Sequence, residues 1–145
     1  KAPGPHMRLT GLALWAAIFL NAVMNGHFYP QLLNYQAGSE MAFQLKRERP
    51  EVGVIHKVGE GHTWAMDFYT GRPLAVTRIN RLRADGVRWL YADGKQLEKL
   101  RESGIAMDIL LHAKQFRITR LQPRFLNPKT REAVLRDRYL VRILP

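Results

Sequence analysis

The chain has 145 residues, with 23 lysines and arginines, 12 aspartates and glutamates, and no cysteine. This is enough chain for one domain with its own hydrophobic core, since domains commonly run to about 100–150 residues. The lack of cysteine excludes disulfides, thiolate metal sites and cysteine nucleophiles. The formal net charge of +11 predicts attraction to an anionic partner, either nucleic acid or a phospholipid surface.

The charges are unevenly distributed along the chain. Residues 9–39 contain no Asp, Glu, Lys or Arg, whereas residues 113–145 contain nine lysines and arginines against two acidic residues. The first seven residues, Lys1-Ala-Pro-Gly-Pro-His-Met7, look like an expression-vector remnant. We therefore divide the chain into a remnant (residues 1–7), an apolar segment (8–30) and a charged remainder (31–145).

The apolar segment follows Arg8 and has the length of a marginal membrane span. A helix from Leu9 to Tyr29 would rise about 31 Å, against about 30 Å for a bilayer core. A signal peptide would need a better cleavage site than Asn21-Ala-Val-Met-Asn-Gly26, and a buried core helix would favour one apolar face. Here the apolar residues surround the helix, and aromatic residues follow at its end. We expect a transmembrane helix, with packing on protein, including a homodimer through this helix, as the alternative.

The remainder alternates between helical and strand patterns. The signals, in chain order, predict one or two collinear helices over 31–49, a strand over 52–58, a glycine turn, a helix over 62–71, strands over 74–79 and 87–92, a helix over 95–103, a strand or connector over 105–111, a strand over 114–121, a short helix from 128 to about 135, and a last strand over 139–144. Asp93 and Asn127 are expected to be N-caps, and Gly71 a C-cap. The order predicts an α/β fold, a small mixed sheet packed with helices, preceded by the apolar, transmembrane-like helix.

Signals for catalysis or metal binding are weak. The turn Gly59-Glu-Gly-His62 loosely resembles a phosphate-binding turn, but it lacks a third glycine, and Arg78 stands where a dinucleotide-binding protein has an acidic residue. The five histidines show no HxH or HExxH spacing. We therefore predict no catalytic residue and no metal site. Trp64 and Trp89 are expected to be core or interface residues.

The basic C-terminal part is the next candidate. It has no recognisable nucleic-acid-binding motif, so nucleic acid is disfavoured. Beside a membrane helix, its arginines would lie close to anionic lipid headgroups. The candidates for this contact are Arg117, Arg120, Arg124, Arg136, Arg138 and Arg142.

Two stretches of the sequence carry a resemblance. Asn25-Gly-His-Phe-Tyr-Pro-Gln-Leu-Leu-Asn-Tyr-Gln-Ala-Gly-Ser39 and Trp64-Ala-Met-Asp-Phe-Tyr-Thr-Gly-Arg-Pro73 resemble the C-terminal end of bacterial membrane glycosyltransferases of the aminoarabinose-transferase and protein O-mannosyltransferase superfamily. In that superfamily, a last transmembrane helix leads into a small α/β domain outside the cytoplasmic membrane. The resemblance covers residues 9–83 well, and the remainder only in its alternation of strands and helices.

The resemblance implies an enzyme that transfers a sugar from a polyprenyl-phosphate donor to a lipid or protein acceptor, often with a divalent metal. The catalytic acidic residues of such enzymes lie on loops between earlier membrane helices, so no residue of this chain inherits that role, and no cofactor is expected within it. The chain would be a non-catalytic domain on the periplasmic side of the bacterial inner membrane, attached to its transmembrane catalytic domain. Polar residues near the strand–helix turns are the candidates for substrate contact: His56, Glu60, His62, Tyr69 and Arg72.

A different class of protein is the alternative. In it the chain is a free-standing basic α/β module, secreted or tethered by its own leader, that binds an anionic polymer, a membrane surface or a protein partner. The upstream reading frame distinguishes the two, because only the glycosyltransferase hypothesis requires further membrane spans before Arg8. A third possibility, an independent small enzyme, requires turnover by this chain alone.

Overall fold

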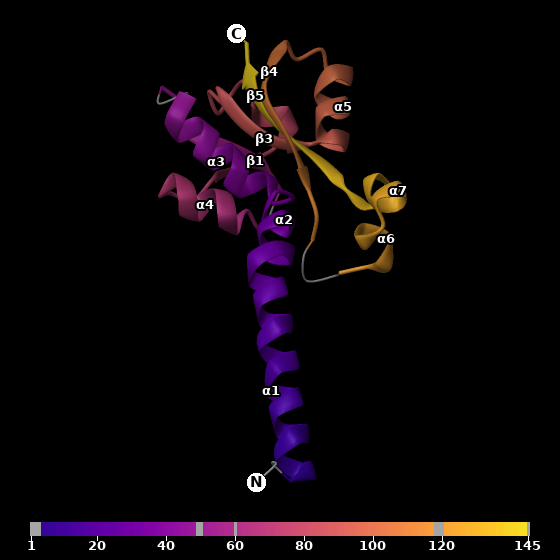
Figure 1. Cartoon of the computed structure of the whole chain (residues 1–145). Coiled ribbons are helices and arrows are strands. Elements are labelled where there is room, and N and C mark those ends of the chain that lie inside the picture. Colours follow the sequence, from indigo (N-terminus) through magenta and orange to yellow (C-terminus); the bar gives the residue numbers. More distant parts are fainter. Residues whose placement is uncertain (1–3, 49–50, 60, 118–120, 145) are drawn as a thin grey trace. The chain divides into compact units, whose positions relative to one another are not determined.

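A computed structural model of the chain describes residues 4–48, 51–59, 61–117 and 121–144. It divides into two compact units, Lys1–Asn34 and Tyr35–Pro145. The first unit is helical and the second is an α/β domain (Figure 1).

The first unit is one run of helix with a single widened turn. Helix α1 (Pro5–Val23) passes through a π-helical turn, η1 (Met24–Phe28), into α2 (Tyr29–Leu33). Its 29 residues would rise about 44 Å, which exceeds the bilayer core of about 30 Å. The helix therefore extends past both ends of the apolar stretch, and the span is longer than the sequence predicted.

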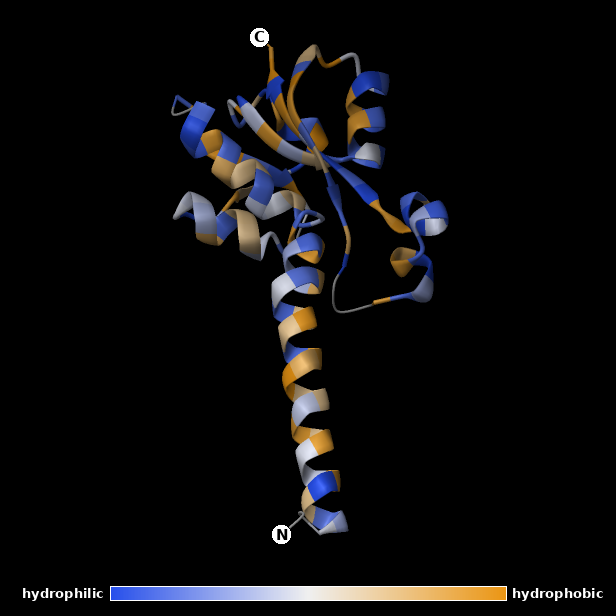
Figure 2. Cartoon of the chain, in the orientation of Figure 1, coloured by the Kyte–Doolittle hydropathy of each residue, from blue (hydrophilic) through white to orange (hydrophobic). Residues whose placement is uncertain are grey.

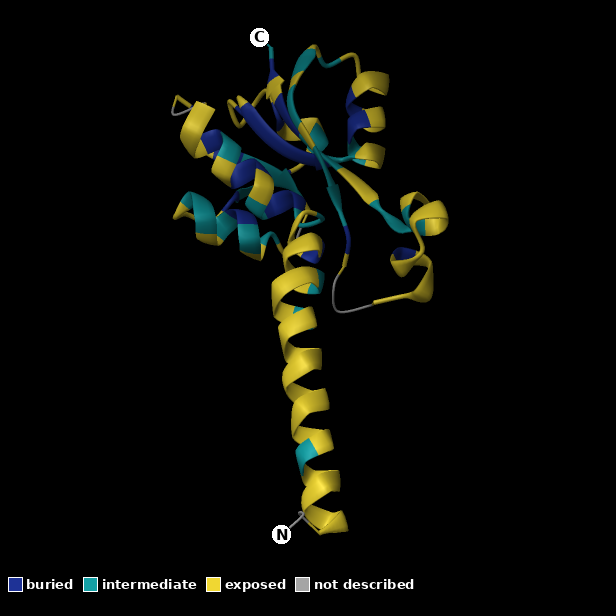
Figure 3. Ribbon diagram, viewed as in Figure 1, coloured by how far each residue is buried: buried dark blue, intermediate teal, exposed yellow. Residues whose placement is uncertain are grey.

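Apolar side chains surround α1 on all sides. Figure 2 shows hydrophobic residues on every visible turn of its middle, and Figure 3 shows the same turns exposed. The large side chains from Leu9 to Phe19 are 49–71% exposed, including Trp15 at 71% and Ile18 at 49%. A core helix of a soluble domain would bury one face, whereas α1 has no buried residue.

The second unit contains a five-stranded mixed sheet in the order β2-β1-β3-β5-β4. Strands β1, β2 and β3 are parallel to one another, whereas β5 is antiparallel to both β3 and β4. The strands are β1 (Ile55–Val58), β2 (Ala75–Thr77), β3 (Trp89–Asp93), β4 (Met107–Gln115) and β5 (Arg136–Ile143). The helices are α3 (Ala37–Glu48), α4 (Trp64–Thr70), α5 (Gly94–Glu102), α6 (Pro123–Leu126) and α7 (Pro128–Arg131), with 3-10 turns η2 (Ile79–Arg81) and η4 (Glu132–Val134). The predicted α/β fold is confirmed.

Helices pack on both faces of the sheet, because the central strand β3 is apolar on both sides. Trp89 and Tyr91 face a core shared with α3 and α4, whereas Leu90 and Ala92 face a core shared with α5. Such a strand, buried on both faces, reads as a continuous apolar run. Gly38 lets α3 approach α4 closely, since a Cβ there would lie 3.2 Å from the backbone nitrogen of Met66.

Local capping signals place the element ends where the sequence predicted them. The Asp93 side chain accepts a hydrogen bond from the backbone N–H of Gln96, and the Gln96 side chain accepts one from the Asp93 N–H, which completes a capping box. Asn127 caps α7 through the N–H of Lys129. Gly71 ends α4 with a φ of 77°, a left-handed conformation that glycine adopts without strain.

The structure differs from the expected elements mainly after residue 104. For residues 105–111, where a strand or a connector was expected, the strand is confirmed, but it continues as one long strand, β4, to Gln115, so the separate strand predicted over 114–121 is wrong for the described residues after Gln115. Phe116 leaves the sheet and stacks on Phe125, with ring centroids 3.8 Å apart, so its alternating pattern reflects a separate aromatic contact. Helix α6 was not predicted. Of the two tryptophans expected in the core or at an interface, Trp89 is 8% exposed and belongs to the core, whereas Trp64 is 73% exposed, which leaves the interface role for it.

Candidate functional site

The predicted substrate-contact residues are spread over the domain. His56 lies in β1, and its Nδ1 is buried with no hydrogen-bond partner among the described residues. Arg72 donates from Nη2 to the carbonyl oxygens of Val52 (3.2 Å) and Gly53 (2.9 Å), so it fixes the segment before β1. Glu60 lies outside the described residues. Among those that are described, the candidates do not converge on one site.

His62 and Tyr69 instead belong to an exposed aromatic surface on α3 and α4. The His62 ring stacks on Trp64, and the rings of Phe43 and Phe68 lie 4.6 Å and 5.2 Å from that of Tyr69. Phe43, Trp64 and Phe68 are 57%, 73% and 78% exposed. Trp64 and Phe68 are four residues apart and so share one face of α4. Exposed apolar clusters of this kind mark interaction surfaces.

The predicted headgroup-contact arginines differ in their surroundings. Arg138 donates to the Gln115 Oε1 (2.6 Å), lies 3.6 Å from an Asp93 carboxylate oxygen and is placed over the Tyr91 ring. Arg142 donates to Asp108 at 2.5 Å. Both are therefore committed to partners within the sheet.

The other predicted arginines lie on different elements or outside the described residues. Arg124 and Arg136 are exposed, on α6 and β5 respectively, and Arg117 is exposed just after β4. Arg120 lies outside the described residues. The structure thus leaves fewer of these side chains for an anionic surface than the charge count suggested.

Burial and a hydrogen bond raise the pKa values of two ionisable groups on the sheet, Tyr91 and Lys114. Burial raises the pKa of Tyr91 above its usual value of 10.0, and the nearby Arg138 opposes the rise. The hydrogen bond to Glu132 raises the pKa of Lys114. Tyr91 is therefore neutral and Lys114 charged at neutral pH, and both serve the packing of the domain.

The α/β domain has an open cavity of about 890 Å³ beside the carboxyl ends of β1 and β2. Val58 and Thr77, the last residues of the two strands, line it together with η2 and the C-terminal part of α5. Among the described lining residues, the cationic side chains are Arg78, Arg83 and Lys99, and the carboxylate is that of Glu102. Carboxyl ends of parallel strands are where α/β folds commonly bind ligands.

Hydrogen bonds hold the frame of this cavity. The Gln96 amide donates to the Val58 carbonyl (3.1 Å), which joins α5 to β1. The Thr77 hydroxyl donates to Asp85 (2.9 Å), which joins β2 to the loop that carries Arg83. The cavity was missed by sequence reasoning because its residues come from three separate segments. Its one visible signal was Arg78, the basic residue at the end of the second parallel strand.

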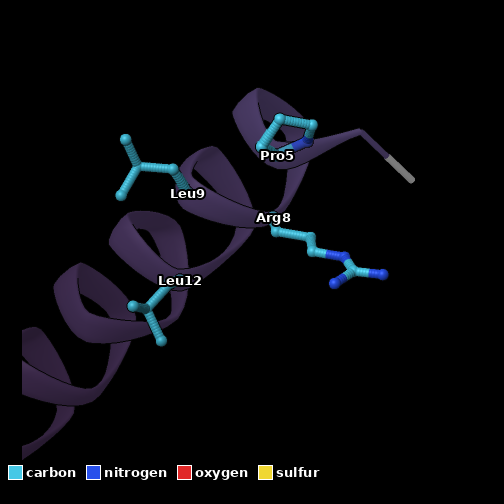
Figure 4. A pocket seen from close by; sticks show the side chains of 4 residues that line it. All are labelled: Pro5, Arg8, Leu9 and Leu12. Carbon is cyan, nitrogen blue, oxygen red and sulfur yellow. The ribbon is translucent and has the colours of Figure 1, made fainter. Parts of the chain in front are cut away.

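Two further features bear on function, the possible metal ligands and the long apolar helix. No group of three or more His, Asp or Glu side chains there could hold a metal ion. One helix, Pro5–Leu33, is long and apolar enough to cross a membrane, and its most apolar window is 0% buried. Figure 4 shows the start of this helix, where Arg8 extends away from Leu9 and Leu12. The hollow that these side chains and Pro5 line lies on one helix alone and offers no catalytic group.

No family model, curated protein or solved structure matches the chain.

Proposed function

We propose that the chain is the C-terminal, non-catalytic part of a bacterial membrane glycosyltransferase that moves a sugar from a polyprenyl-phosphate donor to a lipid or protein acceptor. In this proposal α1 is the last transmembrane helix, and the α/β domain lies on the periplasmic side of the inner membrane. The observation that carries it is the exposed helix Pro5–Leu33, apolar on all sides and followed directly by an α/β domain.

Polar residues within the helix are compatible with a membrane setting. The Asn25 side chain donates to the Asn21 backbone oxygen (2.9 Å) and to its side-chain oxygen (2.6 Å), which reduces the cost of placing these amides in hydrocarbon. Gln31 and His27 pair in the same way at 3.3 Å. Arg8, at the start of the helix, suits the cytoplasmic side of the membrane. The aromatic residues near Tyr29, at its end, suit the opposite membrane–water interface.

The aromatic surface gives this domain a second attachment. Trp64 and Phe68 are too exposed to stabilise the domain by burial, so their area is available for a partner. We assign that partner to the transmembrane catalytic part of the same polypeptide, whose acidic loops and metal would supply the chemistry. The α/β domain would then border the acceptor's route to the catalytic centre.

The genomic sequence upstream of Arg8 tests this function. The proposal predicts an open reading frame that continues upstream and encodes a series of hydrophobic spans. It also predicts that removal of residues 35–145 from the whole protein lowers sugar transfer from a polyprenyl-phosphate donor in isolated membranes. The matched variant is Trp64→Ser/Phe68→Ser, which should lower transfer while the domain stays folded.

A stop codon directly before Met7 would contradict the proposal. It would favour the second candidate, a free-standing basic module tethered by its own leader. The net charge of +11 and the cationic cavity support that candidate.

A further inference from the structure

We infer that the cavity between α5 and the β2–β3 connection binds the phosphate group of a phosphorylated ligand, a function separate from membrane anchoring. All of its lining residues lie between Val58 and Ile105, within the α/β domain. Failure of this inference and failure of the proposed function are therefore distinguishable.

Charge is the first argument. Among the described lining residues, three are cations, Arg78, Arg83 and Lys99, and one is a carboxylate, Glu102, so these residues carry a net charge of +2. A phosphate monoester carries a charge of about −1.5 to −2 at neutral pH. Among the residues that the structure describes, none of the three cations has an ion pair, unlike Arg138 and Arg142 on the sheet.

Preorganisation is the second argument. The loop that carries Arg78 and Arg83 is fixed by the hydrogen bond from Thr77 to Asp85, and Leu82 between them is 1% exposed. The Asp85 N–H also donates to the Arg81 carbonyl at 2.8 Å. A cation on an anchored loop loses less freedom on binding than one on a free loop. Arginine forks suit phosphate oxygens because two N–H groups can donate in parallel.

Size and lining are the third argument. A volume of about 890 Å³ exceeds what inorganic phosphate needs and falls within the range of small-molecule sites. Val58, Ile79 and Ile105 add apolar wall, and all three pack against the second core. The ligand is therefore a phosphate ester with an organic group attached.

Two sources could supply this chemistry, a soluble sugar phosphate or a phosphate-monoester lipid headgroup. The test uses the full chain, ¹⁵N-labelled, in neutral detergent micelles and observed by NMR. One arm adds glucose 1-phosphate, and the other adds phosphatidic acid to the micelles. We expect saturable shifts confined to the cavity residues in at least one arm. Tighter binding of the first probe identifies a soluble ester as the source, and tighter binding of the second identifies a lipid.

The variant Arg83→Gln/Lys99→Gln should raise the Kd about tenfold or more. The matched control, Lys95→Gln/Arg101→Gln, removes the same charge from α5 outside the cavity and should change the Kd less than about twofold. Arg78→Gln gives an independent single-site check from the residue that follows β2 and should also raise the Kd. These side chains are exposed, so the variants should unfold at the same temperature as the native chain. Equal losses in both double variants, or no saturable shift with either probe, would overturn the inference.

Discussion

Replacing Ile18 with arginine is expected to release the chain from membranes. Ile18 lies at the middle of the helical span Pro5–Leu33 and is 49% exposed, so in a bilayer its side chain would meet lipid. On insertion scales, isoleucine to arginine at a helix centre costs about 3–4 kcal/mol. This corresponds to a loss of more than about a hundredfold in the insertion equilibrium. The measurement is the fraction of the chain that stays in the membrane pellet after alkaline extraction.

The matched control places the same charge at the end of the span. Leu33→Arg adds an arginine near the interface, where a long basic side chain reaches water, and should leave the pellet fraction nearly unchanged. Ile18→Leu controls for the change in shape. If Ile18→Arg stays in the pellet like the native chain, the helix is not held by hydrocarbon.

Replacing Trp89 with alanine is expected to lower the free energy of unfolding of the α/β domain strongly. Trp89 is 8% exposed in the central strand and packs in the core with Ile55 and Leu140. Removing a large buried aromatic side chain costs about 3–5 kcal/mol of the free energy of unfolding. For a domain of ordinary stability that is a large fraction of the total. Urea unfolding in neutral micelles, followed by circular dichroism, measures the loss.

Trp64→Ala makes the same chemical change on the surface. Trp64 is 73% exposed, so its removal should change the free energy of unfolding by less than about 0.5 kcal/mol. A large loss from Trp64→Ala, or a small one from Trp89→Ala, would contradict the division between core and interaction surface.

The strand–helix order was predictable because its signals are local. A capping box needs only Asp93 and Gln96, and a left-handed helix end needs only Gly71. The apolar helix was predictable for the same reason, since its composition is local to one stretch of the chain. Its true length was not, because the helix begins within the residues set aside as a vector remnant and continues through Pro30 to Leu33.

Near the C-terminus, long-range contacts determine a structure that local sequence patterns did not predict. The alternation from Lys114 onward reads as a strand, but the Phe116 N–H donates to the Tyr35 carbonyl (2.8 Å), and Phe116 packs with Phe125. Arg131 completes this cluster by donating to the Tyr35 hydroxyl at 2.9 Å. No local pattern links Tyr35 with residues some 80 to 100 positions later.

The candidate sites show the same limit. Arg72 was chosen for its place beside a turn, yet it serves the backbone of Val52 and Gly53. The cavity depends on the sheet order, which brings the ends of β1 and β2 beside α5. Sequence reasoning identified Arg78 as unsuited to a dinucleotide, and the structure gives it a cationic neighbourhood that suits a phosphate.

The most direct test of membrane anchoring is the depth of Trp15. The chain is reconstituted in lipid vesicles that contain acyl-chain-brominated lipid, and its tryptophan fluorescence is compared with that of Trp15→Phe. Trp15 is 71% exposed on α1, whereas Trp64 and Trp89 belong to the α/β domain and remain in both proteins. We predict that the Trp15 contribution is blue-shifted, strongly quenched by the brominated lipid and protected from aqueous iodide. A Trp15 signal quenched by iodide and indifferent to the brominated lipid would contradict a transmembrane α1.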